Sequence, residues 1–229
     1  MEVIATQNFQ PDISLYGMRI GEPVITITSL MISVLCGYCW LRLGRKREDS
    51  DALRLTRIFF AFMGISTLIG GLVGHAFLHL LPFEYKIPGW TLGMVAASAL
   101  AQASIARSAD IISVGAKRLF AGLNIGAFAM LFVLLITTLW FPIVEIHSAF
   151  SLLLIVTTLE LFRWNRLRDQ ASKFILLGIL LAVAAALVHV LKLSLGVWFS
   201  FFDIGHLCLC GTMWMIMRGS EARLKTCGN

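Results

Sequence analysis

Long apolar runs fill most of this chain, and its polar residues gather in short stretches between them. Runs of ~20 apolar residues, enough to cross the ~30 Å hydrocarbon core of a bilayer at ~1.5 Å per residue, recur along the whole sequence. Because backbone polar groups must be satisfied internally in lipid, each run is expected to be helical. The pattern predicts seven membrane-spanning helices, at about residues 23–43, 55–81, 89–106, 119–141, 143–162, 174–195 and 197–217.

The predicted fold is therefore an all-α, polytopic membrane protein, with a single seven-helix transmembrane domain over residues 1–229. The third span is the weakest, because serines and a glutamine dilute it. Pro142 separates the fourth and fifth spans so closely that they must form a helical hairpin. Residues 1–21 have neither the basic nor the apolar region of a signal peptide, so they are expected to remain as an external tail. Residues 218–229 are predicted to form a cytoplasmic tail.

The basic residues are sorted between the two sides of the predicted bundle. Of the 19 Lys and Arg residues, only Arg19, Lys86 and Lys192 fall on one side, and the rest lie in the other loops and the C-terminal tail. Positive residues favour the cytoplasmic side, so the N-terminus is predicted outside and the C-terminus in the cytoplasm, as in a bacterial inner-membrane protein. The net charge of +6 is thus a topology signal. It indicates contact with anionic lipid headgroups and no nucleic-acid binding.

Composition leaves no room for a sizeable soluble domain. The chain is 58% apolar and 14% charged, whereas a soluble domain carries roughly 25% charged residues. Its five cysteines form no disulfide or zinc framework. Cys36 and Cys39 lie in the first span, Cys208 and Cys210 in the seventh, and Cys227 in the tail. The four membrane cysteines are expected to pack as small apolar residues.

All five histidines lie inside predicted spans, each in the half that is farther from the basic loops. Three acids, Glu22, Glu145 and Asp203, are placed in the same way. A polar side chain in hydrocarbon costs several kcal/mol unless it is paired or faces a cavity. The pattern therefore predicts a shared polar site near the outer membrane surface, drawn from His75, His79, His147, His189 and His206.

Two spacings in this set suit a metal ion. His75 and His79 are at i, i+4, and Asp203 and His206 are at i, i+3, so each pair is expected on one helix face. Nitrogen and oxygen donors of this kind make zinc the default metal. We expect His75, Asp203 and His206 as ligands, with His79 or His147 as a fourth ligand or a supporting group. Glycines 70, 71 and 74 would let another helix or a ligand approach closely.

Other interpretations of the same residues stay open. His79, Glu145 and His189 lie within two turns of the interface, where they could join helices by hydrogen bonds or reach the headgroups. Glu22 could complement the dipole of the first helix. Haem held by two histidines is a further alternative, although Asp203 would be an unusual neighbour for it. A retinal protein is excluded, because the seventh span has no lysine for a Schiff base.

The layout resembles the superfamily of alkaline ceramidases and progestin/adiponectin-type receptors, whose members are seven-helix, zinc-dependent amide hydrolases or their relatives. Glu22 is similar to the acid that precedes the first helix in ceramidases. His75, after Gly74, is similar to the zinc histidine of the second helix. His206 is similar to the second histidine of the H-x-x-x-H pair in the last helix.

The chain departs from this pattern at three points. Phe202 stands where the first histidine of the pair is expected, and Gly71 stands where a serine is expected. The aspartate expected early in the third helix has no counterpart. The resemblance therefore supports the fold better than the reaction.

The resemblance implies a zinc-dependent hydrolase that acts on a lipid amide or ester. Zinc would activate a bound water, and Glu22 or Glu145 would move protons. The alternative is a non-catalytic seven-helix membrane subunit, or a lipid-binding receptor, with a structural His/Asp cluster. Small residues in the third span provide a face for close packing, either inside the bundle or against a membrane-protein partner or a second copy.

Overall fold

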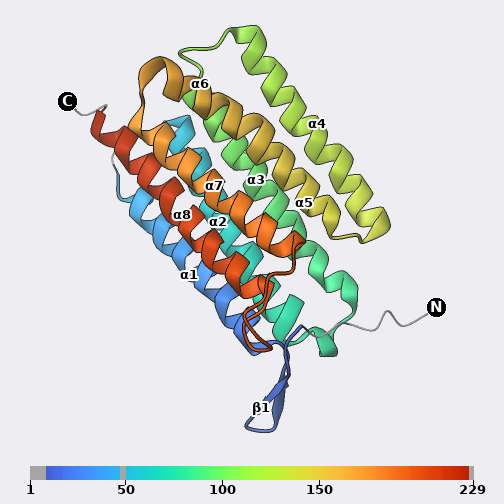
Figure 1. The fold of residues 1–229 in the computed structure, drawn as a ribbon. Helices are drawn as coiled ribbons and strands as arrows, with labels where there is room; N and C mark the ends of the chain where they lie inside the picture. Colours follow the sequence, from blue (N-terminus) through green and yellow to red (C-terminus); the bar gives the residue numbers. More distant parts are fainter. Residues whose placement is uncertain (1–8, 47–49, 227–229) are drawn as a thin grey trace.

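The computed structural model describes residues 9–46 and 50–226, with side chains through residue 222, and this part of the chain is almost entirely helical. Seven helical rods lie side by side in one bundle (Figure 1). The rods are α1 (Pro23–Gly44), α2 (Asp51–Gly71) with the π-turn η1 (Leu72–Ala76), α3 (Ile87–Arg107), α4 (Val114–Thr138), α5 (Pro142–Ala149) continued by the π-helical η4 (Phe150–Val156) and α6 (Thr157–Leu167), α7 (Gln170–Val190) and α8 (Phe201–Thr226). Two short 3-10 turns, η2 (Leu78–Leu80) and η3 (Phe83–Lys86), join η1 to α3.

Five of the rods are long and apolar enough to cross a membrane, as in an integral membrane protein. They are Pro23–Gly44, Asp51–Ala76, Val114–Thr138, Pro142–Leu167 and Gln170–Val190. The other two, α3 and α8, are less apolar along their length than this condition requires, and they pack chiefly on neighbouring helices, α3 on α2 and α8 on α7 and α1. About half of the α3 residues are buried. A helix that faces other helices needs less apolar surface than one that faces lipid.

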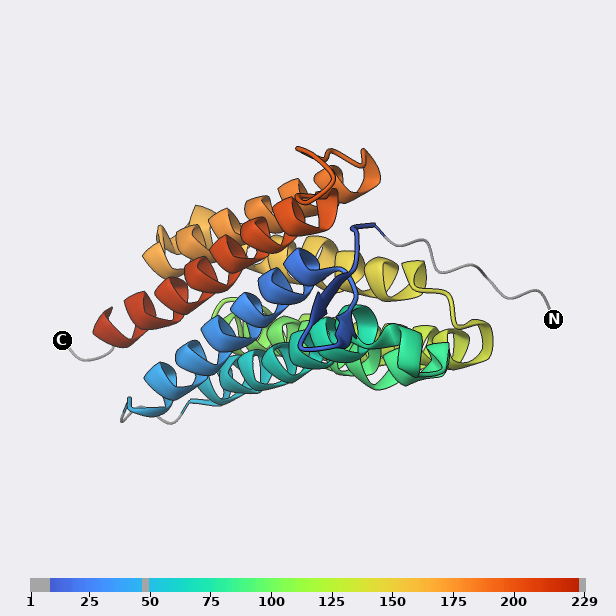
Figure 2. The same ribbon diagram turned by 90° about the horizontal axis from the view of Figure 1, so that it is seen from below.

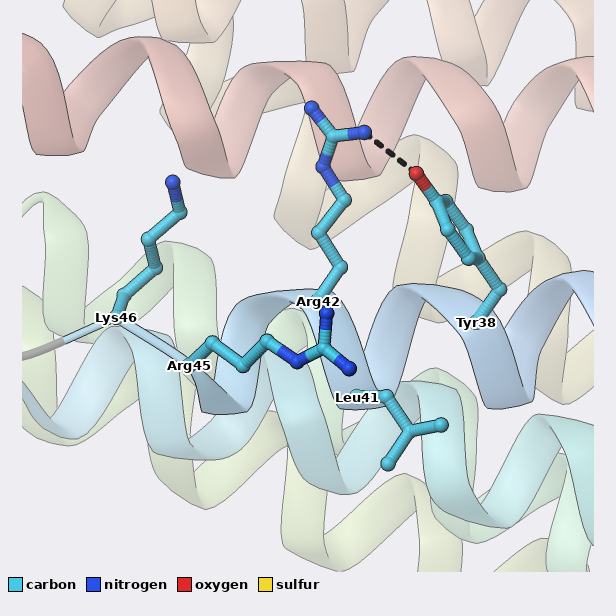
Figure 3. A pocket seen from close by; sticks show the side chains of 5 residues that line it. All are labelled: Tyr38, Leu41, Arg42, Arg45 and Lys46. Atoms are coloured by element: carbon cyan, nitrogen blue, oxygen red, sulfur yellow. Dashed lines mark hydrogen bonds between the residues drawn. The ribbon is translucent and has the colours of Figure 1, made fainter.

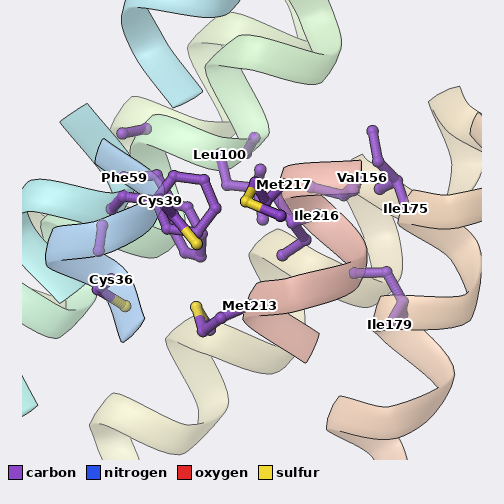
Figure 4. Packing of buried hydrophobic residues seen from close by; sticks show 14 of the residues in the cluster. Cys36, Cys39, Phe59, Leu100, Val156, Ile175, Ile179, Met213, Ile216 and Met217 are labelled. Carbon is purple, nitrogen blue, oxygen red and sulfur yellow. The ribbon is translucent and has the colours of Figure 1, made fainter. Parts of the chain in front are cut away.

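The main apolar core is formed by residues of α1, α2, α3, η4, α6, α7 and α8, part of which is shown in Figure 4. Cys36 and Cys39 of α1 are fully buried there and pack with Phe59 and Met213. This confirms that these two cysteines serve as small apolar residues. Cys208 and Cys210 are free and half-buried on α8, and Cys227 lies outside the described residues.

The structure corrects the boundaries of two predicted spans. The sequence left one residue between the spans 174–195 and 197–217, whereas α7 ends at Val190 and α8 begins at Phe201. Lys192 has a positive φ of 52°, which stops the helix, and the apolar residues after it lie in an exposed connection. At its other end α8 runs on to Thr226, so the described part of the predicted tail is helical.

The predicted external tail is also structured within the described residues. Strands β1 (Ile13–Leu15) and β2 (Met18–Ile20) form an antiparallel hairpin at one end of the bundle (Figures 1 and 2). The α2–α3, α4–α5 and α7–α8 connections lie at this hairpin end. The α1–α2, α3–α4 and α6–α7 connections lie at the opposite, basic end. Among the described residues, Arg19, Lys86 and Lys192 are the basic residues at the hairpin end, as the sequence predicted.

Candidate functional site

Glu22 and His75 form a close pair at the hairpin end. Oε2 of Glu22 lies 2.6 Å from Nδ1 of His75, and Oε1 accepts a hydrogen bond from the Phe9 N–H at 2.6 Å. His75 is carried by the π-turn η1, whose Ala76 carbonyl accepts the N–H of Gly21 at 2.9 Å. A Cβ at Gly21 would come within 2.8 Å of the His75 carbonyl oxygen. Glycine at this position therefore lets the two backbone segments meet and sets the pair in place.

Gln10, which lies outside α1, caps the N-terminus of this helix. Its buried Oε1 accepts the N–H groups of Val24 and Ile25, at 3.1 and 3.2 Å. These N–H groups lack partners within the helix, and the side chain of the N-cap residue Glu22 makes no capping bond. Nε2 of Gln10 donates to Oδ2 of Asp203 at 2.6 Å. One side chain from the N-terminal segment thus joins the first turns of α1 and α8.

Asp203 is fully buried and already has several hydrogen-bond donors. Besides Gln10, its Oδ2 accepts the backbone N–H of Ser200 at 2.7 Å and the Ser200 hydroxyl at 2.8 Å. Its Oδ1 lies 3.2 Å from Oγ1 of Thr28, which is 2.8 Å from Nδ1 of His206. Ser200 directly precedes α8, so the acid at the third helical position bonds back to it as in a capping box. The Ser-x-x-Asp spacing before an apolar run was a signal of this role that the sequence analysis missed.

The ring of Phe202 fills the space between three histidines. Its centre lies 5.7 Å from that of His75, 5.0 Å from that of His189 and 6.5 Å from that of His206. Within the described parts of the chain, no three His, Cys, Asp or Glu side chains are grouped so that they could hold a metal ion. The predicted ligands His75, Asp203 and His206 thus reach the same end of the bundle without converging. We call Glu22, His75, Asp203 and His206, with Gln10 and Thr28, the His–acid cluster.

Of the other predicted site residues, His189 meets the cluster only across the Phe202 ring, and His79, Glu145 and His147 lie apart from it. His79 is exposed on η2, and the expectation that it shares a helix face with His75 is wrong, because the π-turn and a break at Phe77 separate them. His189 lies 3.4 Å from Glu145, and both side chains are partly exposed. This pair joins α7 to α5 at the rim of the bundle.

His147 belongs to a separate buried polar group between α3, α4 and α5. Its Nε2 lies 3.2 Å from the Ser98 hydroxyl, and the Ser98 carbonyl accepts Nδ2 of Asn124 at 3.1 Å. Nδ1 of His147, Oδ1 of Asn124 and the Ser151 hydroxyl have no hydrogen-bond partner among the described residues. His147 is therefore not positioned as a fourth member of the His–acid cluster.

The glycines before His75 differ in what surrounds them. A Cβ at Gly71 would meet the Cβ of Ser29 at 3.0 Å and the Thr26 carbonyl at 3.3 Å, whereas Gly70 and Gly74 face open space. The predicted close approach is thus confirmed at Gly71, where α1 crosses α2.

Lys86 lies at the end of η3, at the hairpin end of the bundle. Burial lowers the pKa of Lys86, and the negative charge of Glu22 opposes that change. Its ammonium lies 4.9 Å from the centre of the Phe83 ring.

An ion network at the basic end was not foreseen from the sequence. Arg107 was assigned to a loop, but it is the last residue of α3, is buried, and lies 3.2 Å from Glu160 and 2.8 Å from Asp169. Arg163 joins Asp169 to Asp110, and the hydroxyls of Ser104 and Ser172 donate to Glu160. We call these residues the Arg107 network. Glu160, an acid inside the fifth predicted span, was the signal that could have revealed it.

Asp169 caps α7 from within this network. Burial raises the pKa of its carboxyl, but Arg107, the Ala171 N–H, Ser172 and Arg163 lower it by more, so the net pKa is below its ordinary value. The ionised form is therefore favoured in the folded protein.

Bundle and cluster together define a helical membrane protein whose polar groups gather at its two ends. A family model, "Family of unknown function (DUF6962)", matches residues 24–225, and the chain belongs to this family. The matched range contains His75, Asp203 and His206 and begins after Gln10 and Glu22. No curated protein and no solved structure matches the chain.

Proposed function

We propose that this protein is a non-catalytic membrane subunit in which the His–acid cluster fastens the N-terminal segment, α1, η1 and α8 together at the outer surface. The observation that carries this proposal is the Asp203 carboxylate, because its four hydrogen-bond contacts come from Gln10, Ser200 and Thr28. A carboxylate used to complete helix ends is a structural group.

The departures from the hydrolase pattern support the same proposal. Phe202 replaces a histidine and its ring separates the remaining ones, and Gly71 packs against α1 where a serine was expected. The aspartate expected in the third helix has no counterpart in α3.

We further propose that all seven rods span the membrane, with the hairpin end outside and the basic end in the cytoplasm of a bacterial inner membrane. The sorting of Lys and Arg residues between the two ends supports this orientation. Reporter fusions after residue 84 and after residue 111 test it, because the first should report outside and the second inside.

A zinc-dependent lipid amidase is the second candidate. The Glu22 carboxylate at Nδ1 of His75 favours it, because metal-binding histidines usually hold a carboxylate or carbonyl at their other nitrogen. The lack of a converging third donor counts against it.

The deciding experiment measures metal content and stability on the same detergent-purified protein. We expect no stoichiometric metal by mass spectrometry, and no change in the thermal midpoint after chelation. Asp203→Asn should lower the free energy of unfolding by about 2 kcal/mol, since an amide nitrogen would face the donors that now bind Oδ2. Gln10→Ala should cost about 1 kcal/mol as a lost helix cap and should speed trypsin cleavage after Arg19.

Glu145→Gln is the matched control, because it makes the same kind of change at an exposed acid of the hairpin end. It should leave stability and cleavage unchanged. About one zinc per chain, lost in His75→Ala or His206→Ala, would overturn the proposal in favour of the hydrolase.

A further inference from the structure

A hollow of about 440 Å³ lies beside the last two turns of α1, at the basic end (Figure 3). It is lined by Tyr38, Leu41, Arg42, Arg45 and Lys46. Leu41 and Tyr38 are about half exposed, so the lining combines apolar surface with three basic side chains. The hollow is far from the His–acid cluster and forms no part of the proposed function.

Arg42 forms a fixed wall of this hollow. Its Nε and Nη2 bind the Glu221 carboxylate of α8 at 2.5 and 3.1 Å, and its Nη1 lies 2.5 Å from the Tyr38 hydroxyl. The Tyr38 ring stacks on Trp214 at 6.5 Å between centres. Glu221 therefore neutralises Arg42, and these contacts hold α1 and α8 together at this side.

Arg45 and Lys46 carry charges that nothing in the described chain neutralises. Neither forms an ion pair or a side-chain hydrogen bond among the described residues, and both are exposed. Figure 3 shows Lys46 and Arg42 extending toward α8, while Arg45 runs back along α1 toward Leu41. Basic residues at a helix C-terminus complement its dipole. That role does not require an apolar hollow beside them.

We propose that this hollow binds the phosphate of an anionic phospholipid. Arg45 and Lys46 line different sides of the hollow and supply the positive charge that attracts the phosphate, and Leu41 with the Tyr38 ring covers the start of the acyl chains. An arginine guanidinium matches phosphate geometry, and basic residues next to a membrane span attract anionic headgroups. A lipid would place its phosphate against the basic side chains and its acyl chains against the apolar ones, whereas a soluble phosphate compound would leave the apolar side chains exposed to water.

The test compares retention of phosphatidylglycerol and phosphatidylcholine by the full-length protein in detergent, measured by native mass spectrometry. Wild type should retain phosphatidylglycerol over phosphatidylcholine. The double variant Arg45→Gln/Lys46→Gln should bind phosphatidylglycerol about thirty-fold more weakly, because each basic residue strengthens binding about five-fold. Lys117→Gln/Arg118→Gln is the matched control, since it removes two exposed charges at the same end of the bundle. The control should bind as wild type does.

Two further measurements distinguish a phospholipid from a soluble phosphate ester as the ligand. Leu41→Gln should weaken phosphatidylglycerol binding several-fold, and millimolar glycerol 3-phosphate should not displace the lipid. An equal loss in the control double variant would show attraction by net charge alone and would overturn the proposal. Displacement by glycerol 3-phosphate at similar affinity would overturn it in favour of a soluble phosphate ester. Thermal midpoints of all variants, measured alongside, should match that of wild type because the changed side chains are exposed.

Discussion

The two ends of this bundle satisfy their buried polar groups in different ways. In the His–acid cluster, carboxylates bind backbone N–H groups, Gln10, hydroxyls and a histidine. In the Arg107 network, carboxylates bind arginines from other helices. The first arrangement mainly completes helix ends, whereas the second mainly pairs acids with arginines, although Asp169 also caps α7. The difference shows that buried polar residues in one membrane bundle can stabilise it in two ways, by capping helices and by pairing acids with arginines.

The largest effect is expected in the Arg107 network. Glu160→Gln should lower the free energy of unfolding by about 3 kcal/mol, because it removes a charge from a fully buried carboxyl and leaves Arg107 with one fewer acid. SDS-induced unfolding of the purified protein measures this, and the loss should exceed that of Asp203→Asn.

Glu221→Gln is the control for this prediction, because it removes an acid from a partly exposed pair with Arg42 at the same end. It should cost less than about 1 kcal/mol. If Glu160→Gln lowers the free energy of unfolding no more than Glu221→Gln does, the buried Arg107 network stabilises the protein no more than a partly exposed ion pair.

Gly70 and Gly71 are neighbours near the His–acid cluster, and substituting each of them tests how tightly the hairpin end is packed. Gly71→Ala should destabilise the protein by about 1–3 kcal/mol, because its Cβ would press on Ser29 and the Thr26 carbonyl of α1. Gly70→Ala, one residue away and facing open space, should be neutral or stabilise by up to about 1 kcal/mol through helix propensity. The same unfolding titration measures both, and the same sign in both variants would contradict the packing seen here.

The smallest effect is the pH dependence that comes from Asp169. Since its pKa is lowered in the folded state, its contribution to stability is present above the unfolded pKa of about 3.9 and is lost as the pH falls through the folded value. Thermal midpoints from about pH 6 to about pH 3 should therefore fall less steeply in Asp169→Asn than in wild type.

Asp51→Asn serves as the control, because the carboxylate of Asp51 is exposed and pairs with Arg54, which is also exposed. Its pH profile should follow that of wild type. A wild-type slope in Asp169→Asn would show that the Arg107 network does not depend on ionised Asp169.

Much of the helical layout could be predicted from local patterns. Backbone groups in hydrocarbon must be satisfied within their own segment, so apolar runs predict helices, and the prediction fails mainly where a boundary depends on one φ angle, as at Lys192. The prediction for His79 failed for a related reason, because the π-turn changed the helix phase after Gly71.

The candidate site was only partly predictable. Glu22, His75, Asp203 and His206 were expected at one end and lie there, but their partners come from far along the chain, as with Gln10 and Asp203, which are 193 residues apart. Arg107 was assigned to a loop because its partners, Glu160 and Asp169, are more than 50 residues away.

The sequence alone determined that the chain is a helical membrane bundle, and which end carries the basic residues, because hydropathy and charge act segment by segment. The tertiary structure decided that Phe202 lies between the histidines, that Gln10 caps α1, and that Arg107 is buried among acids. These outcomes depend on how helices are rotated and which ones are neighbours, and that is set by packing of the whole bundle.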